Sequence, residues 1–395
     1  MYSIKEEIEN SKSELLALRH DFHENPELGY KEFRTSKVIY DYLKNLRFDE
    51  VKNISRTGIA ATLSGRMRFG KTIILRANMD ALPTNEETGV EYASKNKGVM
   101  HAGAHDAHMA VALVVGKLLK RHRDEFNGCV KLVFQPNEEK AGALDMIQDG
   151  VLEQPHADAA LSMNFTQMLD SGKIGISEGR VLGNTEEFVI RIIGKSGNTY
   201  LPNKSIDAAL GAAKIIDAMQ LLETREYDPM YPISIMFGKV RGGSARNIVI
   251  NEMVLEGTIR FLFPENNENI ADVKAAFERI IKGVCETMKL GYELEFIHSN
   301  SSLINNSGLV SVLQRISRIT YGTGANIVDF KSLMGEDFAE FSTRIPSVMT
   351  FFGISNEKKN CIYPNYNSKF NIDEDVLVPA TEYFYRAIID CLKNL

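Results

Sequence analysis

The sequence predicts an α/β protein in which a small domain of βαββαβ order is inserted into a larger α/β domain. Short, nearly continuous apolar runs alternate with amphipathic runs over the first 165 residues, as in a sheet with helices on both faces. Beyond residue 185 the order changes, and it reverts after residue 298. At 395 residues the chain exceeds what one hydrophobic core usually supports. We therefore expect residues 1–184 and 298–395 to form one domain and residues 185–297 another.

The large domain begins with two predicted helices, over residues 4–22 and 32–46. The first ends before Asn25-Pro26, because proline cannot continue a helix. The apolar runs 58–63 and 72–77 predict a β-hairpin or adjacent strands, separated by a glycine- and arginine-rich turn over residues 65–70. The elements expected next are helix 106–120, strand 129–135, helix 141–150 and strand 158–165.

The inserted domain is predicted from a split βαβ pattern. Its elements are strand 187–193, helix 205–222, strands 232–240 and 252–263, helix 270–290 and strand 292–297. The larger domain then resumes with helices 307–319 and 336–341, strand 347–352 and a closing helix, 376–392.

Composition narrows the classes of function. The net charge of −6 and the absence of a basic block argue against nucleic-acid binding. No run of eighteen apolar residues predicts a membrane span, and residues 1–10 lack an apolar signal region, so we expect a cytoplasmic protein. The four cysteines are scattered, which predicts neither a disulfide framework nor a thiolate metal site. A small-molecule or peptide-like ligand is the best expectation.

The residues that indicate chemistry lie around His101, His105 and His108. Imidazole and carboxylate groups are preferred ligands of zinc and similar ions, and Asp106 lies within this segment. Ligands of open α/β sheets bind beyond the carboxyl ends of the strands. The polar residues at or just beyond those strand ends are Asn78, Asp80, Glu138, Glu139 and Asn164. Two adjacent carboxylates can act as metal ligand and general base, although an isolated pair is usually a solvated loop.

Seven stretches together resemble the M20 peptidase family, and in particular its amidohydrolase branch of aminoacylase-like, N-acyl-amino-acid and auxin-conjugate hydrolases. They are Arg19–Leu28, Leu75–Pro83, Met100–His108, Phe134–Glu139, Gly242–Asn247, Gly257–Arg260 and Met334–Phe338. The resemblance implies a zinc-peptidase-like α/β catalytic domain with an inserted ferredoxin-like dimerisation or lid domain. It also implies a homodimer formed through that inserted domain.

The resemblance further implies metal-assisted amide hydrolysis, in which two divalent ions activate a water molecule. By motif, Glu138 matches the general base and Asp80 the acidic residue of the first motif, while His105 and Glu139 match metal ligands. On the lid domain, Asn247 and Arg260 match residues that contact the substrate carboxylate or backbone, and Asn198 stands at the position of a lid histidine.

Several positions depart from the family pattern. Gly103 replaces a cysteine ligand, and Asn164 and Tyr366 replace histidine ligands. Position 78, usually aspartate, is asparagine. Only His105 and Glu139 remain of five expected ligands, unless Asp80, Asp106, His101, His108 or Tyr366 is recruited. We therefore expect either no cofactor or a single weakly bound divalent ion (zinc, manganese, cobalt or nickel).

Three functions remain open. The first is a hydrolase with an altered or mononuclear site that acts on an N-acyl amino acid or a small peptide-like amide. The second is a metal-free acyl-transfer or amide-forming enzyme, and the third is a non-catalytic, ligand-binding dimeric relative. At some of these positions an ordinary structural role is an alternative to a role in catalysis or binding. Asp106 is suited to the helix dipole, Glu336 and Asp337 to capping the helix 336–341, and Arg260 to a salt bridge.

Overall fold

The computed structural model describes residues 4–263, 270–322 and 326–395. The chain divides into two compact units. The first takes the chain up to Gly179 together with Leu303–Phe330 and Asp337–Leu395, and the second takes Arg180–Ser302 and Lys331–Glu336. The predicted insertion, 185–297, lies inside the second unit. The mixed α/β fold class with an inserted domain is confirmed.

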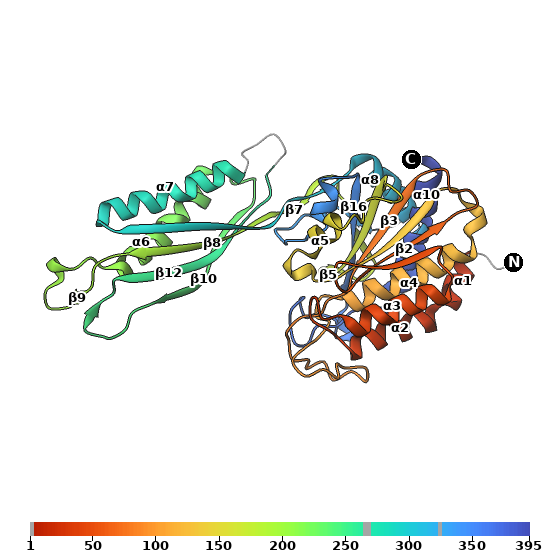
Figure 1. Ribbon diagram of the computed structural model, residues 1–395, viewed down its shortest axis with the longest axis horizontal. Coiled ribbons are helices and arrows are strands. Elements are labelled where there is room, and N and C mark those ends of the chain that lie inside the picture. The colour runs from red at the N-terminus through yellow and green to blue at the C-terminus, as the bar shows by residue number, and fades with distance from the viewer. Residues whose placement is uncertain (1–3, 264–269, 323–325) are drawn as a thin grey trace. The chain divides into compact units, whose positions relative to one another are not determined.

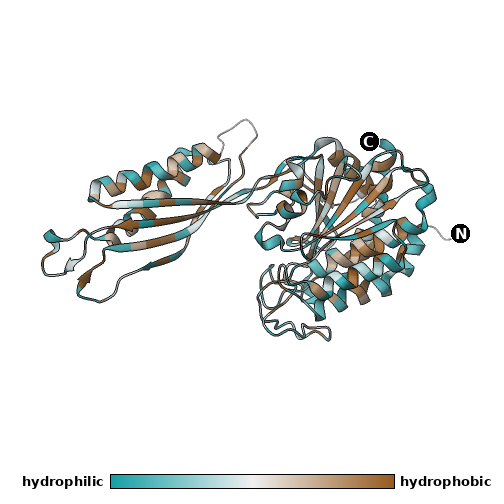
Figure 2. Cartoon of the chain, in the orientation of Figure 1, coloured by the Kyte–Doolittle hydropathy of each residue, from teal (hydrophilic) through white to brown (hydrophobic). Residues whose placement is uncertain are grey.

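An eight-stranded sheet forms the centre of the first unit (Figure 1). Its order is β1 (Glu50–Ile54), β2 (Gly58–Ser64), β4 (Cys129–Gln135), β3 (Thr72–Asn78), β5 (Ala159–Asp170), β16 (Ser347–Ser355), β6 (Lys173–Gly175) and β15 (Asn326–Val328). β3 runs parallel to both β4 and β5, and β16 runs parallel to β5. Every residue of β2, β3 and β4 is buried, which explains why their sequences are mostly apolar (Figure 2).

The expectation that strands 58–63 and 72–77 form a hairpin or lie adjacent is wrong, because β4 lies between them. β2 pairs with β4 in antiparallel register, and β3 pairs with the other side of β4 in parallel register. A continuous apolar run shows that a strand is covered on both faces but does not identify its neighbours. The turn over residues 65–71 is long enough to cross two strand spacings, roughly 10 Å.

Helices pack on the faces of this sheet. They are α1 (Ile4–Asn10), α2 (Lys12–Glu24), α3 (Phe33–Asn45), α4 (His105–Arg121), α5 (Gly142–Gln148), α8 (Ser307–Tyr321), α9 (Ala339–Ser342) and α10 (Leu377–Asn394). Buried side chains of α2, α3, α4 and α10 share one hydrophobic core with β2, β3 and β4. The first predicted helix is interrupted at Ser11. The helix predicted over 336–341 is found only as the short α9, so its proposed cap at residues 336 and 337 is wrong.

The second unit has the predicted βαββαβ order. It consists of β8 (Asn184–Ile193), α6 (Ala208–Leu221), β10 (Ile233–Gly242), β12 (Glu252–Phe261), α7 (Ile270–Met288) and β13 (Gly291–Asn300). The strands form an antiparallel sheet in the order β10-β12-β8-β13, and α6 and α7 contribute to its hydrophobic core. This unit also holds the short strands β9 (Gly197–Asn198) and β11 (Ile248–Val249). The short strand β7 (Gly179–Leu182) begins at the boundary between the units, and β14 (Leu303–Asn305) belongs to the first unit.

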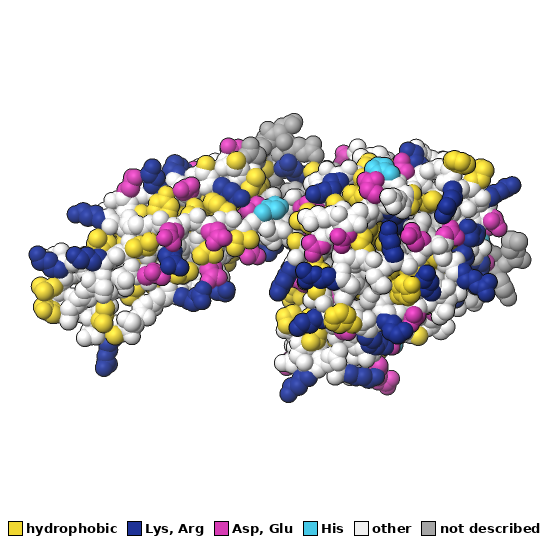
Figure 3. All heavy atoms as spheres, in the orientation of Figure 1, with side chains coloured by type: hydrophobic (Ala, Val, Ile, Leu, Met, Phe, Trp, Pro, Cys, Tyr) yellow, Lys and Arg dark blue, Asp and Glu magenta, His cyan; other side chains and the backbone are white. Residues whose placement is uncertain are grey.

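The surface shown in Figure 3 carries basic and acidic side chains interspersed over both units. Among the described residues, no helix has the combination of length and hydropathy that crossing a membrane requires.

Candidate functional site

Polar side chains gather at the carboxyl ends of β3 and β4, which are hydrogen-bonded neighbours and run parallel. β3 ends at Asn78, and Asp80 follows two residues later. Glu138 and Glu139 follow β4 in a short 3₁₀ turn. Because parallel strands end at the same edge of a sheet, residues distant in sequence are brought to one place, as the sequence predicts.

Three non-glycine residues with a left-handed backbone flank these side chains. Ala104, with φ of 63°, directly precedes His105. Asn137 precedes Glu138 with φ of 53°, and Ala141 follows the 3₁₀ turn with φ of 61°. A left-handed conformation costs a residue with a β-carbon roughly 1–2 kcal/mol, and such residues cluster at functional sites. Both catalytic-type motifs are therefore held by locally strained backbone.

His105 is the residue with the most contacts at this edge. Its Nδ1 donates a hydrogen bond to the carbonyl oxygen of Asp80 at 2.7 Å and lies 3.4 Å from the Asp80 carboxylate. Its Nε2 accepts a hydrogen bond from the Nδ2 of Asn78 at 3.1 Å and lies 4.0 Å from an oxygen of Glu138. Burial acts to lower the pKa of His105, but the hydrogen bonds and charge of Asp80 outweigh it and raise the pKa.

Asp80 holds two parts of the site in place. It is 2% exposed, and its Oδ2 accepts a hydrogen bond from the backbone N–H of Glu139 at 3.2 Å. Burial acts to raise the pKa of Asp80, but the hydrogen bond and charge of His105 lower it below its usual range. The carboxylate is thus directed at His105 and at the backbone of the 3₁₀ turn.

Two of the positions that depart from the family pattern, 103 and 366, lie beside His105 and Glu139. A β-carbon on Gly103 would lie 3.3 Å from Nε2 of His105, so a side chain at this position would point at that nitrogen. The hydroxyl of Tyr366 donates a hydrogen bond to Oε1 of Glu139 at 2.8 Å. Asn164 lies on β5, and its buried Oδ1 has no hydrogen-bond partner among the described residues.

A buried ion pair beneath this edge is absent from the sequence-based list of site residues. Arg76 of β3 is fully buried, and its Nη2 lies 2.5 Å from Oδ1 of Asp337. The same carboxylate accepts hydrogen bonds from the side chain of Gln135 and from the backbone of Ala143. The sequence did indicate such a pair, because an arginine within a run that is otherwise apolar requires a buried carboxylate partner.

The other residues of the histidine segment have two kinds of environment. Asp106 is fully buried and binds His23 at 2.7 Å and Arg19 at 3.0 Å, so it joins α4 to α2. His101 and His108 are buried, and their ring nitrogens have no hydrogen-bond partner among the described residues. Burial lowers the pKa of both, that of His101 to about 3, so both rings are neutral.

The three candidate residues of the second unit do not form one cluster within it. Asn198 of β9 pairs with Ile248 of β11, and the carbonyl oxygen of Asn247 accepts a hydrogen bond from the backbone of Thr199, so the two asparagines are neighbours. Arg260 lies near the carboxyl end of β12, whereas Asn247 lies shortly before the start of that strand. The guanidinium of Arg260 donates a hydrogen bond to the carbonyl oxygen of Leu333 at 3.1 Å.

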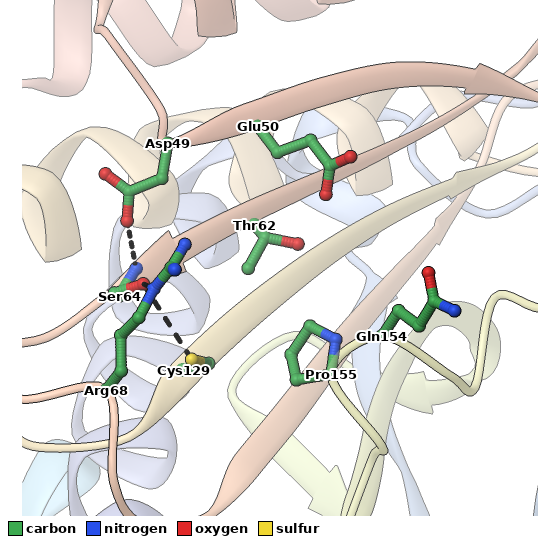
Figure 4. A pocket seen from close by; sticks show the side chains of 8 residues that line it. All are labelled: Asp49, Glu50, Thr62, Ser64, Arg68, Cys129, Gln154 and Pro155. Carbon is green, nitrogen blue, oxygen red and sulfur yellow. Dashed lines mark hydrogen bonds between the residues drawn. The ribbon is translucent and has the colours of Figure 1, made fainter.

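A separate hollow of about 300 Å³ lies at the other edge of the large sheet (Figure 4). Asp49, Arg68 and Cys129 are among its lining residues, and Asp49 accepts a hydrogen bond from the backbone N–H of Ser64. None of the candidate site residues lines it.

Known proteins resemble the chain over nearly its whole length. It is 33% identical to thermostable carboxypeptidase 2 of Saccharolobus solfataricus, over 95% of this chain and 94% of that protein. It is 30% identical to N-acetyl-L-cysteine deacetylase of Bacillus subtilis, over 95% and 88% of the two chains. The crystal structure of Bacillus subtilis YXEP, a dinuclear metal-binding peptidase of family M20, superposes with a TM-score of 0.82 at 28% identity, covering 98% of this chain and all of that one.

The motifs at the sheet edge, the inserted domain and these relatives agree with a direct match of residues 74–390 to one family. The chain belongs to peptidase family M20/M25/M40.

Proposed function

We propose that this protein binds N-acyl amino acids or small peptide-like amides in an M20-type pocket that no longer holds the two-metal centre of the family. The ligand class is supported by the relatives named above, a carboxypeptidase and an N-acetyl-L-cysteine deacetylase at 30% identity or more. The altered chemistry is supported by the contacts of the residues that stand at the metal positions.

The observation that carries the proposal is the hydrogen bond from Asn78 to His105. The Nε2 atom of His105, the one that faces the site, accepts from the amide nitrogen of Asn78 at 3.1 Å. An amide N–H is a donor and cannot bind a metal ion. Oε1 of Glu139 is likewise engaged by the hydroxyl of Tyr366. Polar groups of the protein thus contact atoms that would otherwise face the ions.

The donor set around these residues does not fit two ions. Gly103 offers no ligand atom, and the amide of Asn164 is a poorer ligand for zinc than an imidazole. Asp337, a further carboxylate near this edge, is already paired with Arg76. These facts support either no metal or one weakly bound divalent ion (zinc, manganese, cobalt or nickel).

Within this pocket we assign Glu138 the role of general base for any hydrolysis that remains. It is half-buried beside His105 and adjacent to the residue that Asp80 positions. Without metal ions to polarise the amide carbonyl, most of the transition-state stabilisation is missing, so we expect binding to exceed turnover. On the lid, Arg260 and the asparagines at 198 and 247 are proposed to contact the ligand's carboxylate or backbone.

The test combines metal analysis with ligand binding. We expect elemental analysis of the purified protein to find well under one divalent ion per chain. Isothermal titration of chelator-treated protein with N-acetyl-L-alanine and N-acetyl-L-methionine should still detect binding. About two ions per chain would overturn the loss of the metal centre, and absence of binding by both ligands would overturn the ligand class.

We also propose that the chain forms a homodimer through the inserted domain. β10 and β13 are the edge strands of that domain's sheet. Met230, three residues before β10, is 81% exposed, and Met236, within β10, is 63% exposed. Exposed apolar side chains at a sheet edge favour pairing with a second chain. Light scattering at micromolar concentration should give the mass of two chains, and a monomer would contradict the proposal.

A further inference from the structure

The replaced positions leave two buried amide oxygens at the site without a donor. Oδ1 of Asn78 and Oδ1 of Asn164 are both buried and have no hydrogen-bond partner in the described part of the chain. A buried acceptor without a partner costs roughly 1–3 kcal/mol, and native proteins retain few of them. A ligand that donates hydrogen bonds would satisfy these two oxygens.

The strand register places these two oxygens on one face of the sheet. Arg76 of β3 is paired with Ser162 of β5 in parallel register. Side chains two residues apart on a strand point to the same face, so Asn78 and Asn164 project from neighbouring strands on the side of Arg76 and Ser162. That side also holds the 3.1 Å contact of Asn78 with His105, so the oxygens belong to the proposed pocket.

The charge of the site favours a cationic donor. Asp80, Glu138, Glu139 and Asp337 bring four carboxylates to this edge, against the guanidinium of Arg76 and the imidazole of His105. In a two-metal relative the ions would supply the balancing positive charge. Here the two imidazole positions carry the amide oxygen of Asn164 and the phenol oxygen of Tyr366, which suit a hydrogen-bond donor better than a borderline metal ion.

We infer that the protonated amino group of a small peptide-like amide binds between Asn78 and Asn164, taking the place of a metal ion. Within the proposed ligand class, this favours peptide-like amides with a free α-ammonium group, such as an unblocked dipeptide, over N-acetylated amino acids. An ammonium offers three donors, two of which satisfy the amide oxygens. This inference rests on the proposed function, because it concerns the same pocket.

The test compares two ligands that differ only in this group. L-alanyl-L-alanine carries the ammonium, and L-lactyl-L-alanine carries a neutral hydroxyl at the same atom. We expect titration of chelator-treated protein at pH 6.5, where the amino group is charged, to show at least about tenfold tighter binding of the dipeptide. At pH 9.5 that preference should disappear. Equal affinities at pH 6.5 would overturn the inference while leaving the proposed function intact, and binding of neither ligand nor of N-acetyl-L-alanine would overturn both.

Variants of Asn164 test whether the preference for the ammonium group depends on this residue. Asn164→Leu should weaken binding of the dipeptide about tenfold and change that of lactyl-alanine little, because only the ammonium uses the amide oxygen. Asn164→Asp should strengthen dipeptide binding by adding charge, which keeps the test decisive if the leucine variant folds poorly. The exposed Asn127→Leu is the matched control and should leave both affinities unchanged. Equal responses of the two ligands to both Asn164 variants would contradict the inference.

Discussion

The hydroxyl of Tyr366 donates a hydrogen bond of 2.8 Å to Oε1 of Glu139, which joins residues 227 positions apart. The backbone N–H of Tyr366 also donates to the carbonyl oxygen of Ala102, and Tyr366 has a left-handed φ of 71°. The loop that carries Tyr366 is therefore tied both to the histidine segment, through Ala102, and to the 3₁₀ turn that follows β4, through Glu139.

Restoring the family's ligands should restore metal uptake. The variant Gly103→Cys/Asn164→His/Tyr366→His supplies a thiolate and two imidazoles beside His105 and Glu139, and a β-carbon added at position 103 would lie 3.3 Å from Nε2 of His105. We expect zinc per chain, measured after dialysis against micromolar zinc, to rise from well below one to between one and two.

The single variant Tyr366→Phe is the control for this experiment. It removes the hydrogen bond to Glu139 without adding a ligand, so zinc uptake should stay at the level of the unmodified chain. If the triple variant gains no metal, the three positions are not the replaced ligands.

Any amide hydrolysis by this chain should depend on Glu138. Its oxygen lies 4.0 Å from His105, and a general base typically contributes 10²–10⁴-fold to rate. Glu138→Gln should therefore lower kcat by about that factor and leave KM nearly unchanged, measured by release of free amino acid from N-acetyl-L-methionine. An equal rate in the variant would remove Glu138 from the reaction and would favour a contaminating hydrolase.

The buried pair of Arg76 and Asp337 should matter for folding. Removing one partner of a buried ion pair typically costs about 3–5 kcal/mol, because the other charge stays buried. We expect Arg76→Met to lower the free energy of unfolding by that amount in urea titrations. Arg315→Met breaks an ion pair with Asp390 in which the arginine is half exposed, and it should cost less than about 1 kcal/mol. Similar losses in both variants would contradict the structural role of the buried pair.

Local sequence pattern was sufficient to predict which polar residues meet at the candidate site. Asn78, Asp80 and the pair Glu138-Glu139 each follow a continuously apolar run, and a buried parallel strand ends where such a run meets polar residues. Hydrophobic periodicity also predicted the order of elements in the second unit. These features depend on contacts within a single strand or helix, so they can be predicted directly from the local sequence.

Contacts between distant segments could not be predicted in this way. Nothing local to Asp337 indicates that it pairs with Arg76, 261 residues away, rather than capping a helix. The same holds for β4, which separates β2 from β3 although the turn between them is short. Which distant segments pair depends on the cost of burying a charge and on which strands compete for the same neighbour. Both act only once the chain has collapsed.

The carboxylate of Asp373 should make stability depend on pH in the acidic range. Burial acts to raise its pKa, but hydrogen bonds from Lys359, Asn356 and Ser171 outweigh burial and lower it from 3.8 to about 2. A lowered pKa in the folded state gives stability that is complete above the unfolded value and is lost as pH falls. The difference in unfolding free energy between the unmodified chain and Asp373→Asn, measured in urea, should therefore be constant above pH 5 and shrink between about pH 4 and 2. A difference that does not change over this range would show that the charge of Asp373 contributes nothing.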